Sequence, residues 1–200
     1  MPLTTSESLQ LRSAVHQAYC AAAEDPGQKP PFPIGRALAE RLGYPPGLLD
    51  ALPAASVDAF AGVSNVAMFA ELPRGAVVLD LGCGAGLDSL IAGQRVGPTG
   101  LVVGIDFSNS MLARARRATV SMAMSNVMFC RGDAERLPLG DASVSVALVN
   151  GIFNLNPART EIFRELARVV RPGGAVYAAE LVLQEAVSTP EHFTQAAWFA

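Results

Sequence analysis

The stretch VVLDLGCGAG, residues 77–86, joins a run of apolar residues to three closely spaced glycines. A continuous apolar run of this length is typical of a strand buried on both faces of a parallel sheet. Glycines directly after such a strand let the backbone turn sharply and approach a ligand without a Cβ in the way. The stretch therefore predicts a buried strand, a ligand-binding turn, and a helix whose first N–H groups lack partners within the helix.

From Arg74 onward, strand and helix patterns alternate along the chain. The predicted strands are 76–81, 101–105, 127–130, 144–149 and 175–183, and the predicted helices between them are 87–96, 110–122 and 161–170. The last helix is expected to stop at RPGG, residues 171–174. This alternation predicts the α/β class, with a Rossmann-like, doubly wound, mainly parallel sheet covered by helices on both faces.

Residues 1–72 are instead rich in Pro, Ala and Leu. Helical spacing at 6–23, 34–42 and 64–72 predicts an N-terminal helical arm or lid over a domain formed by residues 73–200, with Ser64 or Asn65 capping the third helix. The segment 25–33 contains Pro and Gly and predicts a connector. A helical pattern that begins near Thr189 stops at the last residue, which leaves open whether C-terminal strands of the fold are missing.

Composition and charge exclude several classes of protein. The chain has 200 residues, a net charge of −3, 50% hydrophobic and 16% charged residues, which suits one domain with a substantial core. The acidic balance argues against a nucleic-acid partner. No apolar run reaches the roughly 20 residues that span a membrane, and the N-terminus lacks a basic signal-peptide region, so we expect a cytoplasmic protein with no membrane partner. Its three cysteines (Cys20, Cys83 and Cys130) are too far apart in sequence to form a CxxC metal-binding motif. The sequence does not indicate an oligomeric state.

The spacing of the glycines favours one type of ligand. Gly82, Gly84 and Gly86 do not follow the G-x-x-x-x-G-K phosphate-binding pattern. They also do not follow the dinucleotide pattern G-x-G-x-x-G, because Leu87 takes the place of its third glycine, which disfavours a nicotinamide oxidoreductase. Asp80 would repel a pyrophosphate but could pair with an ammonium group. The turn therefore suits a nucleoside that carries an amino-acid tail.

Two further carboxylates follow the next strands. Asp106 ends the second strand, where a carboxylate can accept hydrogen bonds from a ribose diol, although it could equally cap the following helix. Asp133 follows the third strand and could accept a hydrogen bond from an adenine amino group. Met111 and Leu112 would then cover the other side of the adenine ring, with core packing as the alternative for Met111.

Together, VLDLGCGAG, Asp106, GDAERLP and RVVRPGG resemble the class I S-adenosylmethionine-dependent methyltransferases. The likeness is strongest to the arsenite methyltransferase branch and runs from about residue 42 to 183. It implies S-adenosyl-L-methionine as cofactor, S-adenosyl-L-homocysteine as product and a small-molecule methyl acceptor. The cofactor-binding residues that it implies are Asp80, Gly82, Cys83, Gly84, Asp106, Phe107, Met111, Asp133, Ala134 and Asn150, the last of these near the transferable methyl group.

The chain departs from the arsenite branch at two positions. Val63 and Gly151 stand where that branch has cysteines, and a soft metalloid needs soft ligands, so arsenic chemistry is not expected. The acceptor should lie at the carboxyl ends of the strands, under the N-terminal arm. The residues expected to contact it are Tyr19, Asn65, Phe153, Asn154 and Glu180, and Phe60 is expected to line the same acceptor pocket. No catalytic residue is assigned, and His16 is not taken as a general base. The alternatives are a cofactor-binding module without activity and an atypical arsenite methyltransferase.

Overall fold

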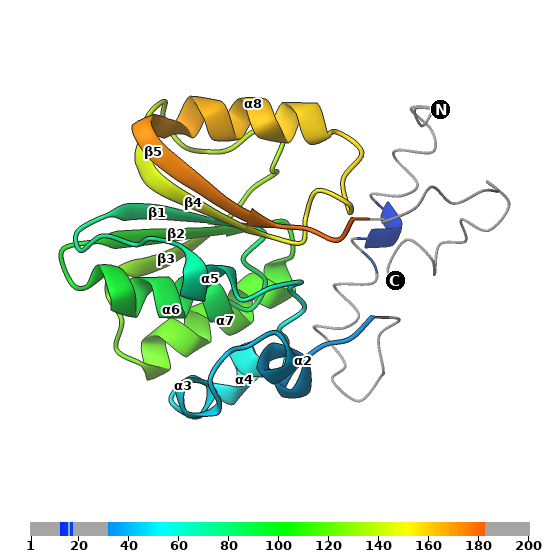
Figure 1. The fold of residues 1–200 in the computed structure, drawn as a ribbon, viewed down its shortest axis with the longest axis vertical. Helices are drawn as coiled ribbons and strands as arrows, with labels where there is room; N and C mark the ends of the chain where they lie inside the picture. The colour runs from blue at the N-terminus through cyan, green and yellow to red at the C-terminus, as the bar shows by residue number, and fades with distance from the viewer. Residues whose placement is uncertain (1–12, 16, 18–31, 183–200) are drawn as a thin grey trace, which may run out of the picture.

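The computed structural model describes residues 13–15, 17 and 32–182, and within them one parallel sheet forms the centre of the molecule (Figure 1). Its strands are β1 (Val77–Leu81), β2 (Leu101–Asp106), β3 (Val127–Arg131), β4 (Val144–Asn150) and β5 (Val170–Ala179). They lie in the order β3-β2-β1-β4-β5, and every neighbouring pair is parallel. The predicted Rossmann-like sheet is therefore confirmed.

Helices cover both faces of the sheet, because successive residues of the buried strands point to opposite sides. Val78 packs into the core on the side of α6 (Leu87–Val96) and α7 (Asn109–Ser121). Its neighbour Leu79 packs into a second core, together with residues of α8 (Arg159–Val169). In Figure 1, α8 lies above the sheet, while α6 and α7 lie below it. The continuous apolar runs of the sequence follow from this burial on two sides.

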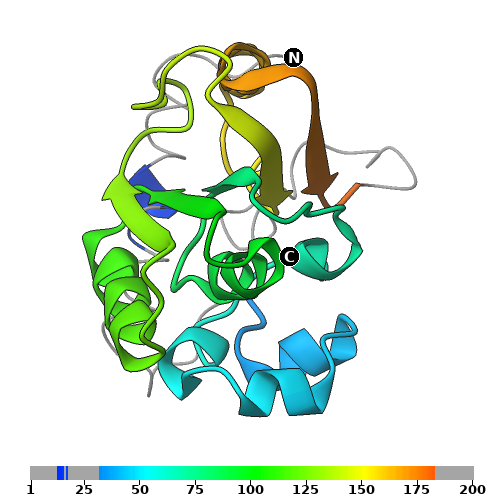
Figure 2. The same cartoon turned by 90° about the vertical axis from the view of Figure 1, so that its left-hand side faces the viewer.

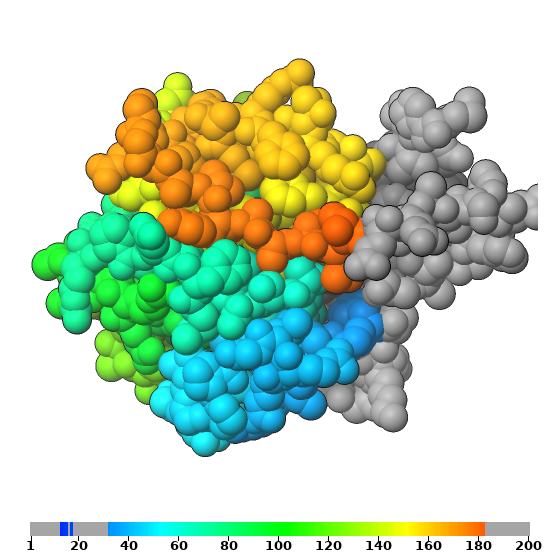
Figure 3. All heavy atoms as spheres, viewed as in Figure 1, coloured from blue at the N-terminus to red at the C-terminus, as the bar shows by residue number. Residues whose placement is uncertain are grey.

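The short helices α2 (Arg36–Arg41), α3 (Pro46–Asp50) and α4 (Ala54–Val57) add a further layer below α6 and α7. The fourth short helix before β1, α5 (Val66–Phe69), instead lies beside α6 and contacts β4 and β5. Figure 2, turned by 90°, again places α2 to α4, in blue to cyan, at the opposite end of the molecule from α8. The space-filling view in Figure 3 shows them as one continuous surface with the rest of the described chain. No helix in residues 13–15, 17 and 32–182 combines the length and apolarity needed to cross a membrane.

Three local predictions differ from the structure. The helix predicted at 64–72 is only the four-residue α5, and Asn65 stands at its N-cap without a side-chain hydrogen bond to the helix. The RPGG segment ends α8, but it already belongs to β5, which begins at Val170 instead of residue 175. The extra residues form a bulge, since Val144 pairs with Val170 and Val146 pairs with Ala175. β5 also ends at Ala179, so Glu180 does not interrupt a strand and instead follows it.

Candidate active site

A cavity of about 400 Å³ opens at the carboxyl edge of the sheet. It lies where β1 has β2 on one side and β4 on the other, the switch point at which open α/β sheets bind ligands. All ten residues predicted to bind the cofactor line it: Asp80, Gly82, Cys83, Gly84, Asp106, Phe107, Met111, Asp133, Ala134 and Asn150. The structure thus brings together residues from the ends of four strands.

The glycine turn forms one wall of the cavity. Gly82 has a φ of 74°, and a Cβ there would lie 2.4 Å from Cγ2 of Ile152, so a side chain is excluded both by conformation and by space. The Gly82 and Cys83 N–H groups donate to the Ile105 carbonyl at 2.8 and 3.1 Å. Gly84 has a φ of 51°, but nothing lies within 4 Å of the position of a Cβ. Its backbone therefore faces open space.

Asp106 fixes the turn to the start of α7. Its Oδ2 accepts from the Gly84 N–H at 2.9 Å, and its Oδ1 accepts from the Ser108 N–H at 2.8 Å. Asp106 does not cap α7, which was the alternative role predicted for it. The N-cap of α7 is Ser108, whose Oγ accepts from the Met111 N–H. This chain of bonds holds the Asp106 carboxylate and Met111 on the same cavity wall.

Two buried carboxyl groups lie behind the turn. Burial, together with the charge of Asp88, raises the pKa of Asp80 to about 8, although Ser89 donates a hydrogen bond to its Oδ2. Burial likewise raises the pKa of Asp88, the second residue of α6, which also lines the cavity. Asp88 is not among the residues predicted from the sequence to bind a ligand. A lone acid in the apolar start of α6, LDSLIAG, is the signal that could have found it.

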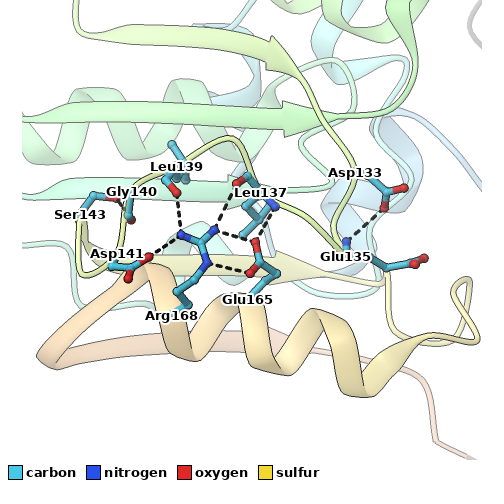
Figure 4. Close-up of polar contacts among 9 residues, drawn as sticks. All are labelled: Asp133, Glu135, Leu137, Leu139, Gly140, Asp141, Ser143, Glu165 and Arg168. Atoms are coloured by element: carbon cyan, nitrogen blue, oxygen red, sulfur yellow. Dashed lines mark hydrogen bonds and ion pairs between the residues drawn. The ribbon is translucent and has the colours of Figure 1, made fainter.

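The segment after β3, which carries Asp133 and Ala134, is held from the other face of the sheet (Figure 4). Arg168 of α8 donates to the Leu137 and Leu139 carbonyls at 3.2 and 2.8 Å. It also contacts the carboxylates of Asp141 and Glu165. Glu165 in turn accepts from the Leu137 N–H at 2.7 Å. One arginine and one glutamate therefore anchor the backbone between Leu137 and Asp141.

Four of the five residues predicted to contact the acceptor lie outside this cavity. Tyr19 is outside the described residues. Asn65, Phe153, Asn154 and Glu180 are described, and none of them lines the cavity. Asn65 donates to the Gly43 carbonyl at 3.3 Å, and the Phe153 ring stacks on Phe163 at 4.7 Å between centroids. Glu180 Oε2 accepts from the Asn154 N–H at 3.1 Å, which joins the loop after β4 to the end of β5. Phe60, by contrast, does line the cavity.

Val63 and Gly151, the two positions at which the resemblance to the arsenite branch implies cysteines, lie close together. A Cβ on Gly151 would lie 3.1 Å from Cγ1 of Val63. Cys83, in the glycine turn, is buried, and burial raises the pKa of its thiol well above the ordinary value. Within the described part of the chain, no group of three or more His, Cys, Asp or Glu side chains could hold a metal ion.

Comparison with known proteins identifies the family. A family model described as a methyltransferase domain matches residues 72–198. The chain belongs to this methyltransferase family. It is 41% identical over 147 residues to an arsenite methyltransferase of Halobacterium salinarum, which covers 72% of this chain and 36% of that protein. It is 35% identical over 106 residues to a demethylmenaquinone methyltransferase of Lactococcus lactis, covering 53% and 42% of the two chains.

A solved methyltransferase has a similar structure. The arsenic(III) S-adenosylmethionine methyltransferase of Chlamydomonas reinhardtii matches with a TM-score of 0.56 and 28% identity, over 73% of this chain and 48% of that one. The predicted resemblance to the arsenite branch is therefore confirmed. The chain spans between about a third and a half of the length of these three relatives.

Proposed function

We propose that this chain binds S-adenosylmethionine in the cavity at the carboxyl edge of the sheet and transfers its methyl group to a small-molecule acceptor. The observation that carries the proposal is that the glycine turn and the carboxyl groups Asp80, Asp106 and Asp133 meet around one cavity. Its volume of about 400 Å³ lies in the range of small-molecule sites. Membership of the methyltransferase family supports the same reaction.

The residues present fit this cofactor. The open space in front of Gly84 leaves the backbone accessible to the amino-acid part, and Asp80 supplies a carboxyl group for its ammonium. Asp106 would accept from the ribose hydroxyls, because its bonds to the Gly84 and Ser108 N–H groups hold the carboxylate in one orientation. Met111 and Asp133 would contact the adenine. When bound, S-adenosylmethionine supplies a methyl group activated by a positively charged sulfonium.

The protein's contribution is then to hold the cofactor and acceptor together and to exclude water. Apolar residues of the loop after α4, including Ala59 and Phe60, and Ile152 of the loop after β4 line the cavity and provide a dry wall. We assign no general base, since in-line displacement on an activated methyl group depends mainly on proximity and alignment.

Calorimetry with S-adenosylhomocysteine tests the cofactor assignment. Removal of the ribose hydrogen bonds in Asp106→Ala should weaken binding by about 2–4 kcal/mol. Asp50→Ala serves as the control, because Asp50 is exposed and forms only a surface ion pair with Arg36. Thermal unfolding of both variants shows whether they are folded. Equal affinity of Asp106→Ala and the wild type would refute the assignment.

Incubation with S-adenosylmethionine and small thiols, phenols and amines tests the reaction. Formation of S-adenosylhomocysteine with one of these acceptors is the expected result. Binding of the cofactor without turnover of any of them would favour the alternative, a cofactor-binding module.

Arsenite is not the acceptor that we propose, although two relatives are named for it. Val63 and Gly151 lie close together, and neither offers a thiolate. We therefore expect arsenite to produce no heat of binding. Binding that is lost in Cys83→Ser would instead favour an atypical arsenite site.

A further inference from the structure

Asn150, the last residue of β4, has a side-chain amide that is fully engaged within the protein. Its Oδ1 accepts from the Val63 and Ser64 N–H groups at 2.9 and 3.1 Å. Its Nδ2 donates to the Ser64 carbonyl at 2.8 Å and to Oδ2 of Asp88 at 2.9 Å. An amide has two donor hydrogens and one acceptor oxygen, so these bonds use both hydrogens and the oxygen. The side chain is therefore bound to the protein's own backbone rather than directed at a ligand.

The backbone that Asn150 holds belongs to the wall of the cavity. We call residues 61–64, the segment between α4 and α5, the roof segment. Ala61 and Gly62 line the cavity. A Cβ on Gly62 would lie 2.5 Å from Nδ2 of Asn150, so the roof segment approaches the amide as closely as a glycine allows. The position of this wall depends on the bonds to Asn150.

Asp88 determines which way the amide of Asn150 points. It is 6% exposed, and its two oxygens accept from the Tyr44 hydroxyl and from Asn150 Nδ2. The Ala67 N–H also donates to it. Because both of its oxygens accept hydrogen bonds here, Asp88 faces the NH₂ end of the amide, which leaves the amide oxygen for the roof segment. Tyr44 is 1% exposed and packs edge-on against Phe60, another residue of the wall.

We propose that Asp88 is a positioning residue, which orients the Asn150 amide and thereby holds the roof segment over the cavity. The inference rests on the proposed function, because the cavity is taken to bind the cofactor. It also changes the role expected for Asn150, from a cofactor ligand to a residue that acts through the roof segment. Asp88 has no cationic partner in the part of the chain that the structure describes, and burying such an acid is costly; this use explains its presence at the start of α6.

A reciprocal exchange of the Asp88 and Asn150 side chains tests whether Asp88 orients the amide of Asn150. In Asp88→Asn the new amide can turn an N–H toward Asn150, so we expect faster hydrogen exchange at Val63 and Ser64 and at least tenfold weaker binding of S-adenosylhomocysteine. The double variant Asp88→Asn/Asn150→Asp restores one carboxylate facing one amide. It also returns an acceptor oxygen to the Val63 and Ser64 N–H groups, but the Ser64 carbonyl loses the donor that Asn150 supplied. Its affinity should therefore recover in part, to at least threefold above that of Asp88→Asn, which general damage to the fold would not allow.

Two controls make each outcome decisive. Arg164→Ala, which removes an exposed ion pair with Glu161, should change neither measurement. If Asp88→Asn does not fold, Tyr44→Phe takes its place, because it keeps the ring and removes the hydroxyl that donates to Asp88. Since that hydroxyl also lies 3.3 Å from the Ser64 carbonyl, exchange is compared at Val63, whose N–H donates to Asn150, and it should be faster there. Unchanged exchange at the roof segment, or a double variant no better than the single ones, would overturn the inference. A wild type that does not bind S-adenosylhomocysteine would instead overturn the proposed function.

Discussion

The stability of the ligand-free protein should fall as the pH rises from 5 to 7, mainly because of Asp80. This side chain is 2% exposed, and its pKa of about 8 compares with an ordinary value of 3.8. Between these two values the folded state holds the proton and the unfolded state has released it. The folded state therefore binds more protons, so the free energy of unfolding decreases with rising pH.

The expected loss is large enough to measure. One proton bound only by the folded state corresponds to about 1.4 kcal/mol per pH unit, so the change over the two units from pH 5 to 7 is about 3 kcal/mol. The buried Asp88 carboxyl, whose pKa is also raised, acts in the same direction. Glu165 has a pKa lowered by its hydrogen bond to Arg168, so it acts only below this window, where its protonation is destabilising.

Urea unfolding at pH 5, 6 and 7 measures the effect, with Asp80→Asn as the matched variant. An asparagine is always neutral and can still accept from Ser89, so its free energy of unfolding should change less over this range. Equal pH dependence in both proteins would refute the role of Asp80. Binding adds a second test, because an ammonium group beside Asp80 favours the ionised form and should make binding of S-adenosylhomocysteine release protons at pH 7.

Three substitutions test the walls of the cavity. Gly82→Ala should lower the free energy of unfolding by about 2 kcal/mol or more, since its Cβ would clash with Ile152 at a positive φ, and an unchanged urea midpoint would contradict this. Gly84→Ala should lower the free energy of unfolding by only about 1 kcal/mol, because the space around its Cβ is open. Its methyl group would enter the cavity, so calorimetry should show weaker binding of S-adenosylhomocysteine. Arg168→Ala should also weaken binding of S-adenosylhomocysteine, because it releases the segment that carries Asp133. Arg164→Ala on the same helix should leave the affinity unchanged. Equal affinities of the two variants would show that the hydrogen bonds of Arg168 are unimportant for the cavity.

The strands at the centre of the sheet could be predicted from the sequence because their burial on two faces leaves a continuous apolar run. β1 begins one residue after the predicted start and ends at the predicted Leu81. At the edge of the sheet the signal fails. RPGG was correctly expected to end a helix, but Pro and Gly are also tolerated in a bulge of an edge strand, and there the pairing with β4 decides where β5 begins.

The candidate site divides in a similar way. The wall formed by the glycine turn, Asp106 and Asp133 follows from residues next to strand ends, which a parallel sheet must bring to one edge, so local sequence is sufficient. The wall formed by the roof segment depends on segments far apart in the chain: Asn150 bonds to backbone 86 residues earlier, and Tyr44 bonds to Asp88 across 44 residues. No spacing rule predicts such pairs. For this reason Asn154, close to the end of a strand, and Glu180, an acid within an apolar run, could be chosen from local sequence and still lie outside the cavity.

The two sides of the cavity are also held by separate devices, on opposite faces of the sheet. Arg168 and Glu165 anchor the segment after β3 from α8, while Asp88 and Asn150 hold the roof segment from α6 and β4. The two sets have no hydrogen-bonding partner in common among the bonds described above. Sites without shared partners usually contribute additively, so the losses of binding free energy in Arg168→Ala and Asp88→Asn should sum in the double variant. A double variant that binds clearly better or worse than this sum would mean that the two walls move as one unit.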